Sequence, residues 1–136
     1  MKKVLSVLIA VLIICSVAIA APLTDTSVMR YKNISQLVAL ISKEDGGCDC
    51  TGRVNLSNVS HAEVTIYLQR SFNGGSSYTD YKVVARDTFY GDGWHTLSGT
   101  ATGLSGDYMY RTKVIVKVYN SSGSVIDSGT AYSNPT

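Results

Sequence analysis

Two cysteines separated by one residue, Cys48 and Cys50, are the side chains of this chain best suited to chemistry. Such a pair can clip a metal ion, form a strained disulfide, serve as a redox switch, or fill two positions on the buried face of a strand. A metal site needs further ligands, and the sequence offers few beyond its 2 histidines. We therefore predict no metal site and no cofactor. Whether the two cysteines form a disulfide, act as a redox switch or pack in the core depends on the conformation of the backbone that carries them.

The histidines do not complete a catalytic constellation. Nucleophilic catalysis needs a nucleophile, a base and a group that orients the base. His61 falls in a predicted turn, His95 follows Trp94 in a glycine-rich loop, and the chain contains no G-x-S-x-G segment. The 10 acidic residues are spread along turns and outer faces. The sequence thus predicts two exposed histidines, no catalytic residue and a non-enzymatic protein, with a hydrolase as a remote alternative.

Nucleic-acid binding is also disfavoured. The chain carries 12 basic and 10 acidic residues, and Lys2 and Lys3 belong to a predicted signal peptide described below. The remaining charge is balanced, which is not typical of a nucleic-acid surface. Arg111, Lys113 and Lys117 form a basic stripe, but apolar and aromatic residues interleave with them, which favours an ordinary outer strand face.

Outward-facing tyrosines are the best candidates for binding. Tyr67 and Tyr119 face outward on two predicted strands that would be neighbours in a sandwich. Exposed aromatic rings on a flat sheet can stack on sugars or anchor a protein partner, and ordinary cross-strand packing is the alternative. Glu63 is placed to form a solvated ion pair with Lys113 or Lys117. Tyr67 and Tyr119 are therefore the candidate residues for a binding surface, with cross-strand packing as the other interpretation.

The first 20 residues have the pattern of a secretory signal peptide. A basic start precedes an apolar run, and Ala18-Ile19-Ala20 fits the small-x-small cleavage pattern. Cleavage after Ala20 would remove Cys15 and leave a leader segment, residues 21–33, ahead of one domain. The alternative is an uncleaved membrane anchor, since about 17 to 25 apolar residues span a bilayer. We expect secretion, with no membrane attachment after cleavage.

The elements that must position these residues are short strands. Cysteine and aliphatic residues alternate with polar ones between residues 48 and 57, as on a half-buried strand. Residues 34–42 match a helical period as well as a strand, and their short length favours a strand. Turn residues separate further strands, predicted at residues 62–69, 78–86, 94–102, 108–119 and 124–132. This spacing predicts an antiparallel sandwich or barrel.

The alternation also assigns faces within each strand. In residues 108–119, Tyr110 and the valines face one way, whereas Arg111 and Lys113 face the other. In residues 78–86, the same rule places Tyr81, Val83 and Ala85 on one face.

The segment "LSGDYMY" places Leu104 six residues before Tyr110, just ahead of an alternating strand. It resembles the L-x-P-G-x-x-Y corner of fibronectin type III domains, with Gly106 and Asp107 in place of the proline and glycine. The resemblance implies that Tyr110 folds back so that its hydroxyl bonds the backbone near the turn. A buried tyrosine hydroxyl needs such a partner.

Four segments carry a resemblance over about residues 30–133: "RYKNIS" at 30–35, "CTGRVNL" at 50–56, "LQRSFNGG" at 68–75 and "YMYRTKVIVKVY" at 108–119. They resemble a family of small secreted proteins of Gram-positive bacteria that is described only as a domain of unknown function. The resemblance implies an all-β, antiparallel immunoglobulin-like sandwich of about six to eight strands at residues 34–133, following a signal-peptide helix. It implies a cysteine near position 50 and supplies no activity.

In such a strand the two cysteines have different prospects. Residues two apart in a regular strand hold their Cβ atoms too far apart for a disulfide, so Cys50 is predicted to be an inert core residue. Gly46 and Gly47 precede Cys48, and their backbone freedom would allow it to curl towards Cys50 and form a strained disulfide. We expect a secreted binding module at the bacterial surface, with cell-wall polysaccharide or a surface protein as partner. A metal- or redox-responsive domain using Cys48 and Cys50 is the alternative.

Overall fold

Seven strands make up the part of the chain that the structure, a computed structural model, describes, which is residues 31–136. They are β1 (Ile34–Glu44), β2 (Gly47–Leu56), β3 (His61–Ser71), β4 (Thr79–Tyr90), β5 (Gly93–Thr102), β6 (Met109–Tyr119) and β7 (Val125–Tyr132). The predicted signal peptide and most of the segment 21–33 lie outside the described residues. Within residues 31–136, no helix is long and apolar enough to cross a membrane.

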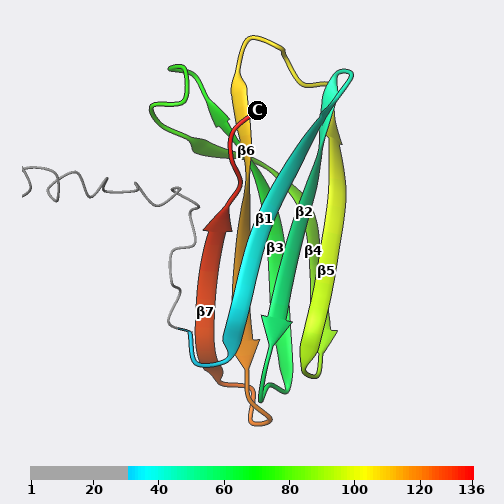
Figure 1. Cartoon of the computed structure of the whole chain (residues 1–136), viewed down its shortest axis with the longest axis vertical. Coiled ribbons are helices and arrows are strands. Elements are labelled where there is room, and N and C mark those ends of the chain that lie inside the picture. The colour runs from blue at the N-terminus through cyan, green and yellow to red at the C-terminus, as the bar shows by residue number, and fades with distance from the viewer. Residues whose placement is uncertain (1–30) are drawn as a thin grey trace, which may run out of the picture.

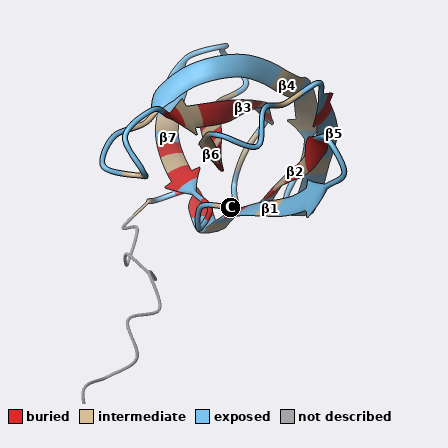
Figure 2. Cartoon of the chain, turned by 90° about the horizontal axis from the view of Figure 1, so that it is seen from above, coloured by how far each residue is buried: buried red, intermediate tan, exposed pale blue. Residues whose placement is uncertain are grey.

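The strands form two antiparallel sheets, one in the order β1-β2-β5 and the other in the order β4-β3-β6-β7 (Figure 1). This arrangement confirms the predicted all-β, antiparallel sandwich. The edge strand β1 lies along β7 and the edge strand β4 lies along β5, so the two sheets meet at both seams (Figure 2). Residues 34–42, whose periodicity was compatible with a helix, lie in β1.

The core follows the alternation predicted for β2 and β6. On β6, Val114, Val116 and Val118 are fully buried, whereas their neighbours in sequence are half-buried or exposed. On the facing sheet, β2 turns Val54 and Leu56 inward. Burying each such side chain stabilises the fold by about 1.5–3 kcal/mol. The two inner faces therefore hold the sheets together and leave both outer faces open to solvent.

Strand β4 departs from the predicted alternation, and the assignment of Tyr81, Val83 and Ala85 to one face is wrong. Ala85 pairs with Ile66 on the inner face of β3, whereas Val83 pairs with Tyr67 on the outer face, because a bulge inserts an extra residue between them. A second bulge in β4 lies between Asp80 and Lys82, which pair with Gln69 and Leu68 of β3. As a result Val83 is 54% exposed on the outer face.

The loop between β5 and β6 is anchored by Tyr110. This side chain is 4% exposed, and its hydroxyl donates a 3.0 Å hydrogen bond to the carbonyl of Ser105. Leu104 packs against the core beneath it. Where the fibronectin-type corner has Pro-Gly, the Ser105 hydroxyl donates to the Asp107 carboxylate and accepts a hydrogen bond from the Asp107 backbone N–H, both at 3.2 Å. Local side-chain bonds thus shape the turn that proline and glycine would otherwise set.

Candidate functional site

Cys48 and Cys50 lie flat in β2 as free thiols. Cys48 pairs with Lys43 and Ala101 in an unbroken register, so the glycines before it do not curl it towards Cys50. Cys48 is 2% exposed and Cys50 is fully buried. Burial raises the pKa of both thiols above the ordinary value of 9.0. Shielded, protonated thiols are poor nucleophiles and poor metal ligands, and residues 31–136 contain no cluster of three or more candidate metal-binding side chains.

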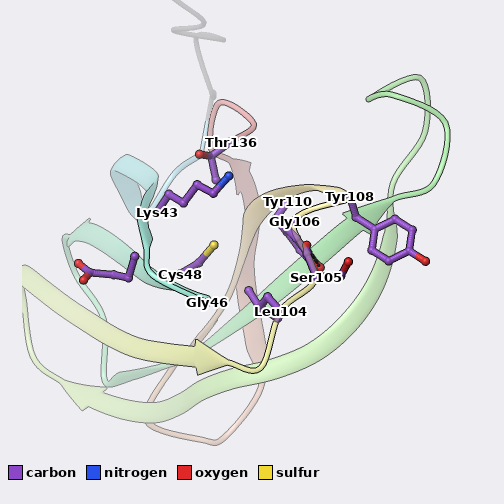
Figure 3. A pocket seen from close by; sticks show the side chains of 11 residues that line it. Lys43, Gly46, Cys48, Leu104, Ser105, Gly106, Tyr108, Tyr110 and Thr136 are labelled. Atoms are coloured by element: carbon purple, nitrogen blue, oxygen red, sulfur yellow. Dashed lines mark hydrogen bonds between the residues drawn. The ribbon is translucent and has the colours of Figure 1, made fainter.

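A small cavity lies beside Cys48 at one end of the sandwich (Figure 3). Cys48 lines it from β2, and Leu104 and Tyr110 line it from the other side. Its volume is about 80 Å³, far below the roughly 300–1,000 Å³ of typical ligand pockets. The cavity has room for a few water molecules at most, so it is not a substrate site.

The two histidines lie in strands rather than in a turn and a loop, and both are half-buried rather than exposed. The ring of His61 stacks on Tyr119 at 4.7 Å. His95 stacks on Phe89 at 4.9 Å, and its Nε2 lies 3.0 Å from the carbonyl of Gly91. Within the described part of the chain, neither imidazole pairs with a carboxylate. Both rings therefore serve as aromatic packing partners.

Tyr119 and Tyr67 face outward on the neighbouring strands β6 and β3, but they do not form one platform. Tyr119 lies opposite His61, and Tyr67 lies opposite Lys113, six residues away along β6. That offset is about 20 Å. The Tyr119 hydroxyl donates a 3.0 Å hydrogen bond to Glu63, which raises the pKa of Tyr119. Tyr119 thus packs on His61 and bonds Glu63 at one end of the sheet, away from Tyr67.

Glu63 lies opposite Lys117 in the register but forms no ion pair with it, and in the described residues the Lys113 ammonium pairs with Asp80 instead. The ion pair predicted between Glu63 and Lys113 or Lys117 is therefore wrong. Two features explain why this ion pair does not form. The Tyr119 hydroxyl donates a hydrogen bond to the Glu63 carboxylate. The bulges of β4 place Asp80 opposite Gln69, where the Lys113 ammonium reaches it.

Tyr67 belongs to a row of four outward-facing residues that crosses all four strands of the larger sheet. The register aligns Val83 on β4, Tyr67 on β3, Lys113 on β6 and Tyr132 on β7. We call these four residues the tyrosine row. It spans three strand spacings, about 14 Å. Val83 and Tyr132 at its ends are 54% and 51% exposed, and the Lys113 ammonium lies over the Tyr67 ring at 5.1 Å.

A polar network supports the tyrosine row. Gln69 is 6% exposed, donates a 2.8 Å hydrogen bond to Asp80 and accepts one of 2.8 Å from Arg111 Nε. Lys113 also bonds Asp80, at 3.1 Å. Partial burial acts to raise the pKa of Asp80, but the bonds from Gln69 and Lys113 outweigh it and lower this pKa. Asp80 is therefore ionised at neutral pH and holds both neighbours in place.

Aromatic rings hold the cations of this sheet. The guanidinium carbon of Arg111 lies 4.2 Å from the ring centre of Tyr78 and 4.3 Å from that of Tyr132. Arg70 lies over three further rings, with Tyr81 nearest at 4.0 Å. Such contacts contribute about 0.5–2 kcal/mol each and fix the rings in orientation. The rings of Tyr78 and Tyr132 beside Arg111 are thus ordered before any ligand arrives. Arg70 lies instead on the inward-facing side of β3, opposite the buried Tyr110.

Sequence reasoning identified Tyr67 but missed Tyr132 and Val83. The outward direction of Arg111 and Lys113 followed from the alternation of β6, but their alignment with Tyr132 depends on the register between β6 and β7. No local sequence signal fixes that register. No protein-family model matches the chain, and none of the curated proteins compared with it gives a match.

Proposed function

We propose that this protein is an exported, non-enzymatic binding module that acts at or near the bacterial cell surface and binds cell-wall polysaccharide through the tyrosine row. The observation that carries the proposal is the alignment of Tyr67, Tyr132 and Val83 across the outer face of the larger sheet, where Tyr132 and Val83 are each about half exposed. A surface protein is the alternative partner, and the test below separates the two.

The tyrosine row suits an extended sugar chain. Its length of about 14 Å is set by strand spacing, and it crosses all four strands of the larger sheet. Tyrosine rings offer apolar faces to sugar rings while their hydroxyls remain in water. Because Lys113 and Arg111 already order the rings of Tyr67 and Tyr132, little conformational entropy is lost on binding.

The alternative based on Cys48 and Cys50 gains no support from the geometry. Both thiols are buried, and the adjacent cavity admits nothing larger than a few water molecules. A metal- or redox-responsive role would require the sandwich to open first. The outer face, by contrast, is accessible in the folded protein.

Co-sedimentation with insoluble, protein-free cell walls of a Gram-positive bacterium tests the proposal. Wild-type protein should sediment with the walls, and Tyr132→Ala should reduce the bound fraction about tenfold, because stacked aromatic anchors dominate such surfaces. Tyr90→Ala provides the matched control, since Tyr90 is 74% exposed on β4 outside the tyrosine row. It should bind like the wild type.

Equal sedimentation of the Tyr132→Ala and Tyr90→Ala proteins would remove the tyrosine row from consideration. If folded wild-type protein fails to sediment with protein-free walls but sediments with walls that retain their proteins, the partner is a surface protein instead. Loss of binding only in Tyr132→Ala supports the proposed function.

A further inference from the structure

The polar network beside the tyrosine row leaves the guanidinium of Arg111 with unused hydrogen-bond donors. Its Nε donates to Gln69, but in residues 31–136 no carboxylate lies within 4.0 Å of it. Its terminal amino groups make no hydrogen bond with described residues and are not sealed from solvent. Arg111 therefore keeps donors available for a ligand.

The local acid does not neutralise Arg111. Asp80 is the only carboxylate in this network, and it accepts bonds from Gln69 at 2.8 Å and from Lys113 at 3.1 Å. Gln69 separates Asp80 from Arg111, because its amide nitrogen faces Asp80 and its oxygen faces Arg111. The ion pair with Lys113 therefore neutralises Asp80, and no acidic residue of this network neutralises Arg111 beside the tyrosine row.

The surroundings of Arg111 favour a planar anion. Aromatic rings stack on the flat faces of a guanidinium, so the rings of Tyr78 and Tyr132 leave its N–H edge as the open direction. A carboxylate approaching that edge can accept two parallel N–H bonds in the same plane. Tyr132 belongs both to the tyrosine row and to the Arg111 stack, so a sugar on its ring would hold a carboxylate substituent near Arg111.

From this charge complementarity we propose that the ligand is an acidic polysaccharide whose uronate carboxylate binds the N–H edge of Arg111 while its sugar rings stack on the tyrosine row. This inference rests on the proposed function and specifies its ligand class. It assigns Arg111 a role in selectivity that the aromatic rings alone do not provide, since rings stack equally well on neutral sugars.

The opposite sheet supplies a matched control. Arg53 on β2 lies over the exposed ring of Trp94 on β5, with its guanidinium carbon 4.9 Å from the ring centre. Both residues are on the outer face of the smaller sheet, away from the tyrosine row. Arg53→Gln and Arg111→Gln therefore remove the same charge. Arg53→Gln removes one arginine–aromatic contact and Arg111→Gln removes two, with Tyr78 and Tyr132, but only Arg111→Gln changes the proposed site.

Affinity electrophoresis with protein produced from the full chain measures the effect, in native gels that contain polygalacturonate or, separately, neutral dextran. Wild type should be retarded more strongly by polygalacturonate than by dextran. Arg111→Gln should weaken retardation by polygalacturonate about tenfold, as expected for a lost charge-assisted hydrogen bond. It should weaken retardation by dextran much less, because a neutral sugar loses only the ordering of the Tyr132 ring. Arg111→Lys, which keeps the charge but not the planar fork, should also lose most of the preference.

Arg53→Gln should retain the wild-type preference, and unchanged circular dichroism should show that each variant is folded. If dextran and polygalacturonate retard wild type equally and Arg111→Gln changes neither, the uronate inference is overturned while polysaccharide binding stands. If Arg53→Gln and Arg111→Gln lose the same amount, the effect is general charge and the inference is again overturned. Folded protein that neither polysaccharide retards would count against both the inference and the proposed function.

Discussion

Cys48 and Cys50 illustrate how position decides the chemistry of a residue. The same two thiols would be reactive in an exposed loop, but on the inner face of β2 they are shielded and their pKa values are raised. In the folded protein the two cysteines, which were candidate metal ligands in the sequence, pack in the hydrophobic core. The reactivity of these thiols therefore measures whether the sandwich is closed.

We predict that iodoacetamide labels Cys48 and Cys50 slowly in the native protein at neutral pH and rapidly after unfolding in urea, as measured by peptide mass mapping. Reactivity requires the thiolate and access to it, and burial suppresses both. Leu104→Ala, which removes a side chain lining the cavity beside Cys48, should accelerate labelling of Cys48 more than that of Cys50. Fast labelling of either thiol in native wild type, or a peptide in which the two are disulfide-linked, would contradict this prediction.

The same pKa shifts give a pH dependence of stability. Below pH 9.0 the thiols are protonated in both the folded and the unfolded chain. As pH rises past 9.0, the unfolded chain loses these protons first, because the folded pKa values are higher, and the free energy of unfolding falls. Replacing both cysteines by alanine should reduce this alkaline loss.

At the scale of the element, the seam between β4 and β5 depends on a glycine. A Cβ atom at Gly99 would lie 2.7 Å from the carbonyl oxygen of Val84 and 2.8 Å from its Cγ1. The carbonyl belongs to the bulged backbone of β4, which cannot move aside as a flexible side chain can. Gly99 therefore allows the edge strands of the two sheets to approach each other.

We predict that Gly99→Ala lowers the free energy of unfolding by about 1–3 kcal/mol, as is typical of overpacking. The measurement is the midpoint of urea-induced unfolding followed by circular dichroism. Gly106→Ala is the control, because no atom lies within 4 Å of the added Cβ and the backbone there is compatible with alanine. A Gly99→Ala midpoint equal to that of Gly106→Ala would show that the seam is looser than these distances indicate.

Sequence alternation predicts which face of a strand a residue occupies, but it does not predict bulges or the register between strands. The alternation of β2 and β6 identified the buried Val54, Leu56 and Val114 because neither strand is itself bulged: where their pairing is irregular, the extra residue lies in the neighbouring strand β1 or β7. In β4, bulges moved Val83 to the outer face, and bulges arise from fitting one strand to its neighbours. Likewise, outward faces could be assigned to Tyr67 and Tyr119, but their offset of six residues depends on the register between strands.

At the scale of the whole molecule, the two outer faces differ in chemistry. The larger sheet carries the tyrosine row and the cations Arg111 and Lys113, whereas the smaller sheet presents Trp94 with Arg53 and hydroxyl-bearing side chains. The closed seams leave these faces as the main accessible surfaces. The proposed wall polymer lies outside the cell, so the proposed function requires the protein to be exported.

The predicted signal peptide makes that requirement testable. When the full chain is expressed in a Gram-positive host, we predict that the protein in the culture medium or on the wall begins at Ala21, as determined by intact mass and N-terminal sequencing. Replacing Ala18 and Ala20 by leucine should block processing, because the peptidase needs small residues at those positions, and should leave the longer chain membrane-associated. Protein found only inside the cell with residues 1–20 attached would separate the sandwich from any wall polymer and would contradict the proposed surface role.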